Sequence, residues 1–382
     1  IGENNSGKTN ILRAIDILFG ESHPAYKDFD DHDYFGRNSN EKTKIRIEAE
    51  VEGFNSFKNK EYKTFILEKS KNEPNKYKVL DEKDKEIKGY ISNEEREKLI
   101  SIFISSDRNL NYQLSYSSKH TLLSKVMKSF HNKLTSDKKR VEKLKGTYQK
   151  TLEIFDEVQE FKEFKDKMSS ITGNFIQNMT HALELDFSAY DPSNYFKNLQ
   201  VLPKDENNIL NFDELGTGQE QILALSFAYA YAKCFKNTSS LILLIDEPEA
   251  HLHPLAQKWL AKTLFEIAQQ GLQIVISTHS PYFIDLNYLE GMYIVRKVEG
   301  KTEIINKTQK DLAEKCKNTG VSNTDEEKVI PFYSKSATSN ILKGLFANKI
   351  VLVEGLTEEI SLPIYLEAVG LDILERWWSK RW

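Results

Sequence analysis

The first residues of the chain have the types and spacing of a phosphate-binding loop. Residues 2–9 read GENNSGKT and satisfy the pattern G-x-x-x-x-G-K-[ST]. The two glycines allow the backbone to curl so that successive N–H groups point at phosphate oxygens. Lys8 supplies a positive charge to the β- and γ-phosphates, and the Thr9 hydroxyl is a ligand for Mg²⁺. The expected ATP-binding residues of this loop are Gly2, Asn4, Asn5, Ser6, Gly7, Lys8 and Thr9.

Two adjacent carboxylates follow a strand-sized apolar run. Residues 241–245 read LILLI and lead into Asp246 and Glu247. Such a run suits a strand buried on both faces of a parallel sheet, and open α/β sheets bind ligands at the carboxyl ends of their strands. We therefore expect Asp246 to hold Mg²⁺, directly or through water, and Glu247 to polarise the attacking water.

A histidine follows the next predicted strand. A helix expected from Pro254 to Gln270 and an apolar strand at residues 272–277 lead to His279. Because this strand is expected beside the strand that ends in Asp246, His279 can contact the γ-phosphate or the attacking water. The intervening His251 and His253 are interpreted as part of a loop that faces a partner subunit, with a zinc site as the alternative.

A second glycine-rich turn precedes a predicted helix. Residues 213–221 read DELGTGQEQ, and the helix is expected to continue to about Lys233. Exposed N–H groups at a helix start bind anions. Because one chain needs only one phosphate loop, this turn is expected to contact the nucleotide of another subunit and so to support an ATP-dependent homodimer. An ordinary helix cap is the alternative. The nucleotide-binding residues expected here are Gly216, Gly218 and Gln219.

The remaining predicted elements would surround these motifs. Helical spacing of apolar residues predicts a helix at residues 10–19. Alternating apolar and polar residues predict an antiparallel sheet, with strands at residues 44–51, 62–69 and 76–80. Residues 102–105 are expected to return to the main sheet, and residues 136–179 to be mostly helical.

Composition places the chain among globular proteins. Its 382 residues are 39% hydrophobic and 29% charged, which is enough to build a sizeable core. No apolar run approaches the ~18 residues that a membrane-spanning helix needs, and no signal peptide opens the sequence. The two cysteines have no ligand spacing and favour a reducing compartment. We expect a cytoplasmic protein without a membrane partner.

Positive charge is concentrated in one region, although the net charge is -4. Between Lys119 and Lys150, ten Lys or Arg residues stand against Asp137 and Glu142. Such a local excess can meet nucleic-acid phosphates by counterion release even on an acidic protein. The alternative is a solvated helix face, and the sequence leaves both interpretations open.

Together these motifs resemble the ABC ATPase superfamily in its SMC- and RecF-like branch. The segment DEPEAHLHP, followed by STHSP, is similar to the OLD family of ATP-dependent endonucleases and related phage-defence ATPases. The resemblance implies an α/β fold: an ABC-type P-loop ATPase head with an antiparallel β flank and a helical insertion, followed by the first βα unit of a Toprim domain. It also implies an ATP-controlled dimer that acts on DNA. The alternative is a RecF- or SMC-like ATPase that binds DNA or a partner effector protein without cutting, whereas the form of the second glycine-rich turn argues against a transporter subunit.

The end of the chain resembles the opening of a Toprim domain. Residues 349–353 are predicted to form an apolar strand, followed by Glu354, Glu358 and a helix to about Val369. The resemblance implies that the two glutamates hold Mg²⁺ or Mn²⁺ for phosphodiester cleavage, since carboxylates suit hard cations. The family carries an Asp-x-Asp pair on a later strand, and none follows Gly370. We therefore expect cleavage from a longer parent protein, not from this stretch alone.

The motifs predict five segments along the chain. They are an N-terminal ATPase lobe at 1–110, a helical insertion for dimerisation or DNA contact at 111–200, a C-terminal ATPase lobe at 201–310, a linker at 311–348, and the start of a Toprim domain at 349–382. The phosphate loop begins at Gly2, with only Ile1 of its delivering strand before it. We therefore expect the sequence to be part of a longer protein.

Overall fold

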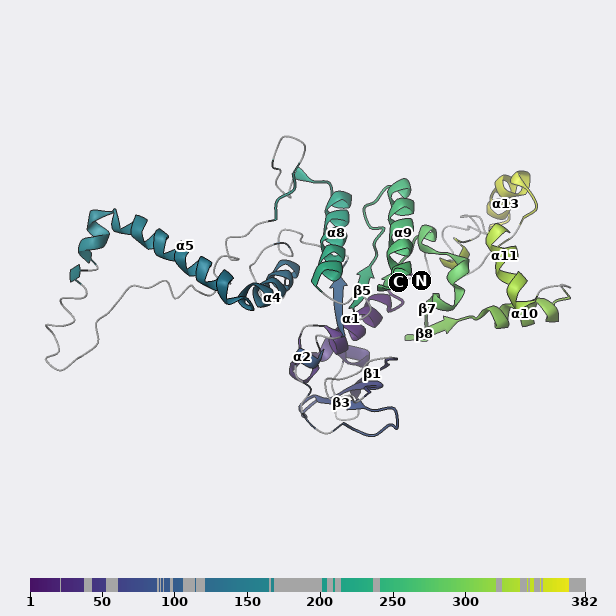
Figure 1. The fold of residues 1–382 in the computed structure, drawn as a ribbon. Coiled ribbons are helices and arrows are strands. Elements are labelled where there is room, and N and C mark those ends of the chain that lie inside the picture. The colour runs from purple at the N-terminus through teal and green to yellow at the C-terminus, as the bar shows by residue number, and fades with distance from the viewer. Residues whose placement is uncertain are drawn as a thin grey trace. The chain divides into compact units, whose positions relative to one another are not determined.

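The fold combines strands and helices in mixed order along the chain (Figure 1). The computed structural model describes residues 1–20, 22–37, 43–52, 61–87, 89, 91, 93–96, 99–105, 114, 121–164, 166–167, 201–204, 209, 214–235, 241–320, 325–336, 342, 344–346, 351 and 353–370. Two compact units are distinguished: Gly7–Thr278, and Ile1–Ser6 together with His279–Trp382. The five segments expected from the sequence stay a prediction.

A three-stranded parallel sheet forms the centre of the Gly7–Thr278 unit. Its strands are β4 (Ile100–Ile104), β5 (Leu241–Asp246) and β6 (Gln273–Ser277), in the order β4-β5-β6. Every residue of β5 is buried, as expected for a central strand with apolar residues on both faces. The structure thus confirms the two predicted apolar strands as parallel neighbours, and the predicted return near residue 102 to the same sheet.

Three helices pack against this sheet. They are α1 (Lys8–Phe19), which contacts all three strands, α8 (Thr217–Phe235), which contacts β4, and α9 (Pro254–Gln269), which contacts β6 (Figure 1). Each lies where the sequence predicted a helix. Proline opens α9 at its first position, where the missing N–H has no intrahelical partner to lose.

The predicted antiparallel flank is also confirmed. It consists of β1 (Lys44–Glu50), β2 (Thr64–Ser70) and β3 (Lys76–Leu80), paired in the order β1-β2-β3. Its inner face shares one apolar core with α1 and β5. That core consists of Leu12, Leu18, Phe19, Tyr62, Phe65, Leu67, Val79, Ile91, Leu99, Ile242 and Leu244. The flank therefore fixes the helix that begins at the phosphate loop.

A buried arginine holds the end of α1. Arg96, the last residue of the short helix α2 (Asn93–Arg96), is 8% exposed. Its Nη2 donates to the carbonyl oxygens of Leu18, Gly20 and Ser22, at 3.3, 2.6 and 3.2 Å. These are carbonyls at and just beyond the helix C-terminus, which have no intrahelical donors. Burial, and then the nearby Arg96 charge, lower the pKa of His23 below its ordinary value, against an opposing hydrogen bond to Ile91.

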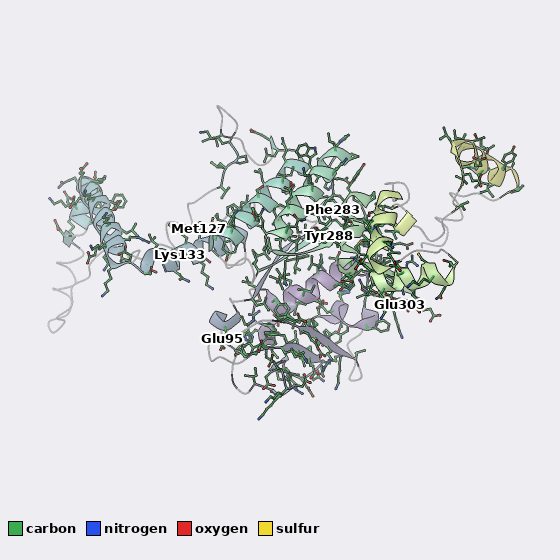
Figure 2. All side chains as sticks on the ribbon, turned by 45° about the vertical axis from the view of Figure 1, so that its right-hand side comes forward. Glu95, Met127, Lys133, Phe283, Tyr288 and Glu303 are labelled. Atoms are coloured by element: carbon green, nitrogen blue, oxygen red, sulfur yellow. The ribbon has the colours of Figure 1, made fainter. Side chains whose placement is uncertain are left out.

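The predicted helical insertion contacts α8. Its described helices are α4 (Leu122–Thr135) and α5 (Lys138–Asp156). The hydroxyls of Ser129 and Tyr231 lie 3.3 Å apart, and Lys133 Nζ donates to the carbonyl of Cys234 at 3.4 Å (Lys133 is labelled in Figure 2). The mostly helical segment predicted over residues 136–179 is confirmed in part by α5, and residues 165 and 168–179 lie outside the described residues.

The second unit begins with a β-hairpin. Its strands β7 (Tyr293–Val298) and β8 (Lys301–Asn306) pair antiparallel, and the first residues of the chain run parallel to β7. Ile1 donates from its amino group to the carbonyl of Tyr293 at 2.8 Å and accepts from the amide of Val295 at 2.7 Å. The phosphate loop therefore begins at a residue, Gly2, that forms a parallel bridge with Val295 of β7.

Helices complete the second unit. Leu289, Ala313, Cys316, Val329 and Ile330 form a small core between α10 (Gln309–Asn318), α11 (Glu326–Ser336) and the 3₁₀ segment η7 (Leu286–Gly291). The predicted terminal helix is present as α13 (Leu356–Ala368). Of the predicted strand at 349–353, Val351 and Val353 have no strand assignment, and the other three residues lie outside the described part of the chain.

Short 3₁₀ segments connect several of these elements. They are η1 (Pro24–Tyr26), η2 (Asp31–Asp33), η3 (Phe35–Arg37), η6 (Pro281–Phe283) and η8 (Gly344–Phe346). In the part of the chain that the structure describes, no helix has the length and apolar character required to span a bilayer.

Candidate active site

The phosphate loop enters α1 through a glycine in the left-handed region. Gly7 is the N-cap residue with φ 104° and ψ 10°, a conformation that a side chain rarely permits. Its carbonyl accepts from the amide of Ile11 at 3.2 Å, so the helix begins directly at the loop. Lys8, the first helical residue, is only 7% exposed. A lysine at the start of a helix, where the first N–H groups have no intrahelical acceptor, is a favourable place for phosphate.

Ser6 carries a buried hydroxyl that fits a phosphate ligand. The residue is 1% exposed, and its Oγ has no hydrogen-bond partner among the residues that the structure describes. Its carbonyl is used, because Thr302 Oγ1 donates to it at 2.8 Å. An unsatisfied buried hydroxyl costs about 1–3 kcal/mol, and a phosphate oxygen would supply the missing partner. This observation agrees with Ser6 as one of the expected ATP ligands.

Thr9 and Asp246 meet although they are 237 positions apart in the sequence. Thr9 Oγ1 donates to Asp246 at 3.2 Å from Oδ1 and 3.0 Å from Oδ2. Ser277, opposite Asp246 in the register of β5 and β6, donates a short hydrogen bond from its Oγ to Oδ1. The Asp246 carboxylate is 2% exposed. Hydroxyl and carboxylate oxygens are the ligands that Mg²⁺ prefers, so the donor set fits that ion.

Glu247 has a strained backbone at the end of β5. Its φ is +47°, in the left-handed region that residues with side chains seldom occupy. The peptide is held in place because the Glu247 amide donates to the carbonyl of Ser277 at 3.0 Å, and the Glu247 carbonyl accepts from Ala250 at 3.1 Å. Strain of this kind costs of order 1–3 kcal/mol and is characteristic of functional sites. The residue is half-buried.

The two residues after β6 make separate contacts. Thr278 Oγ1 donates to Glu249 Oε1 at 2.8 Å, so Glu249 ties the loop after β5 to the end of β6. His279, the next residue, belongs to the second unit, where its ring lies 6.4 Å from the ring of Phe346 at an interplanar angle of 39°. Phe346 ends η8, a few residues before Glu354.

The second glycine-rich turn packs against the loop that follows Glu247. A Cβ on Gly218 would lie 2.8 Å from Leu252 Cδ2 and 3.3 Å from the His251 carbonyl, so only glycine fits there without displacement. Gln219 reaches back, and its Oε1 accepts from the Gly216 amide at 3.2 Å. The turn therefore has a structural role at the start of α8 in addition to the expected nucleotide contact. Asp213, in the same motif, lies outside the described residues.

The two histidines of the intervening loop do not converge. His253 is the N-cap of α9, where its Nδ1 accepts from the Leu255 amide at 3.3 Å. His251 is exposed and has φ +62°. Across the described residues, no group of three or more His, Cys, Asp or Glu side chains is placed to hold a metal ion.

The two glutamates near the end of the chain flank the start of α13. Both are exposed. Glu358 Oε2 would lie 3.2 Å from a Cβ built on Gly355, so this carboxylate turns back toward the N-terminus of its own helix. Two carboxylates make an incomplete metal site, and no third joins them within the described part of the chain. We derive no cleavage step from their geometry.

The comparisons with known proteins agree with this geometry. A family model described as AAA ATPase domain matches residues 1–101 and 50–284. This chain belongs to the AAA ATPase domain family. The OLD nuclease of Thermus scotoductus is 23% identical over 380 residues, covering 94% of this chain and 68% of that protein. The Old nuclease of Escherichia phage P2 is 28% identical over 176 residues, covering 44% of this chain and 28% of that protein.

A solved structure supports the fold of this AAA ATPase. Stu0660 of Streptococcus thermophilus superposes with a TM-score of 0.53 at 13% identity, covering 96% of this chain and 93% of that one. The resemblance to OLD nucleases is confirmed by the two nuclease relatives, and the AAA ATPase domain match supports an ATPase head. The phage relative is matched over little more than a quarter of its length.

Two residues of the candidate site of this AAA ATPase were not predicted from the sequence. Ser277 fixes the Asp246 carboxylate, and Glu249 binds Thr278. Ser277 is the polar last residue of an apolar strand, and this position is the feature of the sequence that could have indicated its role in the site. The contact between Glu249 and Thr278 could not be found in the sequence, because it depends on the register of β5 against β6.

Replacing Gly218 of this AAA ATPase by valine is expected to destabilise the fold. The new side chain would displace Leu252 and the His251 carbonyl, and overpacking of this kind costs typically 1–3 kcal/mol. Gly216→Val is the matched control, because a Cβ there meets only Gln219 Oε1, at 4.0 Å. Urea unfolding would measure both variants. Equal stability of the two would contradict the close approach at Gly218.

Proposed function

We propose that this chain binds and hydrolyses ATP as the head of an OLD-type nuclease that acts on DNA. The contact between Thr9 and Asp246 carries the proposal. It brings the hydroxyl of the phosphate loop onto a buried carboxylate at the carboxyl end of the central strand. This is where open α/β sheets bind ligands.

Each site residue has a separate role in the proposed hydrolysis. Lys8 and the loop amides bind the β- and γ-phosphates, while Ser277 keeps the Asp246 carboxylate oriented toward Thr9. Glu247 accepts a proton from the attacking water, and His279 orients that water or the γ-phosphate. Mg²⁺, held by Thr9 and Asp246, would neutralise charge on the phosphate oxygens.

The second glycine-rich turn supports a proposed homodimer. Gly216, Gly218 and Gln219 lie at the start of α8, and the N-terminus of a helix favours a phosphate from the nucleotide of another subunit. ATP would then hold two heads together, and hydrolysis would release them. When the two heads separate, the surface that they had buried would be open to a partner effector protein.

The action on DNA rests on the relatives and on the Toprim resemblance. Two relatives are named OLD nuclease, and Glu354 and Glu358 match the first carboxylates of a Toprim domain. Their carboxylates would hold Mg²⁺ or Mn²⁺, which are the hard cations that such oxygens select. The remaining ligands would come from residues beyond the described part of the chain.

The test is metal-dependent cleavage of a supercoiled plasmid by the complete gene product. Glu354→Gln is expected to abolish cutting while ATP hydrolysis stays at the wild-type rate. Glu367→Gln, another exposed carboxylate on α13, is the matched control and should cut normally. A wild-type protein that hydrolyses ATP but never cuts with Mg²⁺ or Mn²⁺ would overturn the nuclease part of the proposal. It would favour an ATPase that serves another effector.

A further inference from the structure

Helix α5 presents a row of lysines along one face. Lys139, Lys143 and Lys150 are all exposed. They are spaced four and seven residues apart, so at about 100° per residue all three fall within roughly 40° of one another around the helix. At 1.5 Å per residue the row extends about 16 Å along the axis. We call these three residues the lysine row.

The lysine row differs from the neighbouring Arg140 in its ion pairing. None of the three forms an ion pair with another residue that the structure describes. Arg140 differs, because its Nε pairs with Asp137 at 3.2 Å and its Nη1 donates to the Lys133 carbonyl at 3.3 Å. Among the described residues, these three ammonium groups therefore have no acidic partner.

The surroundings of the row suit a phosphate backbone. Gly146 lies between Lys143 and Lys150 near the same face, and a Cβ built on it meets no atom within 4 Å. A partner can therefore approach the helix closely at this point. Other residues of α5 on this side of the helix include Glu142, Gly146 and Glu153, and none of them carries a ring on which a single-stranded base could stack. These features favour the sugar-phosphate surface of a duplex.

The helix that carries the row is anchored to the ATPase. Asp137 caps α5 by accepting from the Lys139 amide at 2.9 Å, and α4 binds α8 through Ser129 and Lys133. Helix α8 begins with the glycine-rich turn at Gly216–Gly218. A ligand on the lysine row is thus connected, through α4 and α8, to a segment expected to contact nucleotide.

We propose that Lys139, Lys143 and Lys150 bind the phosphate backbone of duplex DNA without reading its sequence. The proposal rests on the DNA substrate of the proposed function and assigns to α5 a place where that DNA is held. Each lysine that neutralises one phosphate steepens the dependence of log K on log salt by about 0.9, so the row accounts for about 2.7 of that slope.

The test measures binding of a fluorescent 30-base-pair duplex by anisotropy between 50 and 200 mM KCl. The variant Lys139→Gln/Lys143→Gln/Lys150→Gln is expected to lose about 2.7 from the salt slope. Over this range the wild type should therefore lose roughly 40-fold more affinity than the variant. The matched control is Lys310→Gln/Lys315→Gln/Lys317→Gln, which removes three exposed lysines from α10 and should keep the wild-type slope. Circular dichroism and ATP hydrolysis without DNA should be unchanged in both variants.

The outcomes separate this inference from the proposed function. If the wild type binds the duplex and the α5 variant keeps the full slope, the lysine row is not the DNA site, and the proposed function stands. An equal loss in the α10 control would show that net charge, not this face, determines binding. If the wild type binds no duplex at any salt concentration, the DNA substrate itself is wrong and the inference falls with it.

Discussion

Replacing Glu247 by glutamine is expected to lower the rate of ATP hydrolysis by about 10²- to 10⁴-fold, the usual contribution of a general base. Glutamine has nearly the same shape, but its amide does not accept a proton at neutral pH. The backbone at φ +47° is held by main-chain hydrogen bonds to Ser277 and Ala250, so the substitution leaves that geometry in place. Lys8, Thr9 and Asp246 are untouched. ATP affinity should therefore stay near the wild-type value.

Phosphate release at saturating ATP and calorimetric titration with ATP measure the two quantities separately. Glu249→Gln is the matched control in the same loop, because Glu249 binds Thr278 and a glutamine oxygen can still accept that hydrogen bond. We expect this control to retain most of the activity. If Glu247→Gln keeps full activity and Glu249→Gln is inactive, Glu247 is not the general base and the assignment made here is wrong.

Replacing Arg96 by methionine is expected to cost roughly 2–4 kcal/mol of the free energy of unfolding. The guanidinium donates to three carbonyls around the end of α1, and methionine would leave them buried without donors. Because α1 begins at the phosphate loop, local loosening of this helix should also weaken ATP binding. Urea unfolding measures the first effect and ATP titration the second.

Arg46→Met is the control for Arg96. Arg46 lies on β1 and pairs with Glu48 and Glu68, but its side chain is about half exposed, and solvent-exposed ion pairs contribute little to stability. A second measurement follows His23, whose pKa is lowered by burial and then by the Arg96 charge. In a folded Arg96→Met variant that pKa should rise toward its ordinary value, as seen by NMR titration, and in Arg46→Met it should not change. Equal stability losses in the two variants would refute the role given to Arg96.

Much of the local structure could be predicted because it depends on short-range pattern. The run LILLI has apolar residues on both faces, and only a central strand buries both. Apolar and polar residues alternate along residues 44–51, which predicts a strand with one face toward a core, and β1 has this alternation of burial. The basic segment was equally visible as charge. That three of its lysines, Lys139, Lys143 and Lys150, share one face of α5 could be seen once the bounds of the helix and its ion pairs were known.

By itself the sequence determined the residue types and the order of the elements: a phosphate loop leading into a helix, an acidic pair after a buried strand, and a histidine after the next strand. Only the tertiary structure decided which distant atoms meet. Thr9 and Ser277 both donate hydrogen bonds to the Asp246 carboxylate, and Gly218 leaves room for the Leu252 side chain. Patterns within a segment reflect burial and backbone preference, which act locally. The register of β5 on β6 and the packing of α8 depend on the summed contacts of the whole core, and no short stretch of sequence contains them.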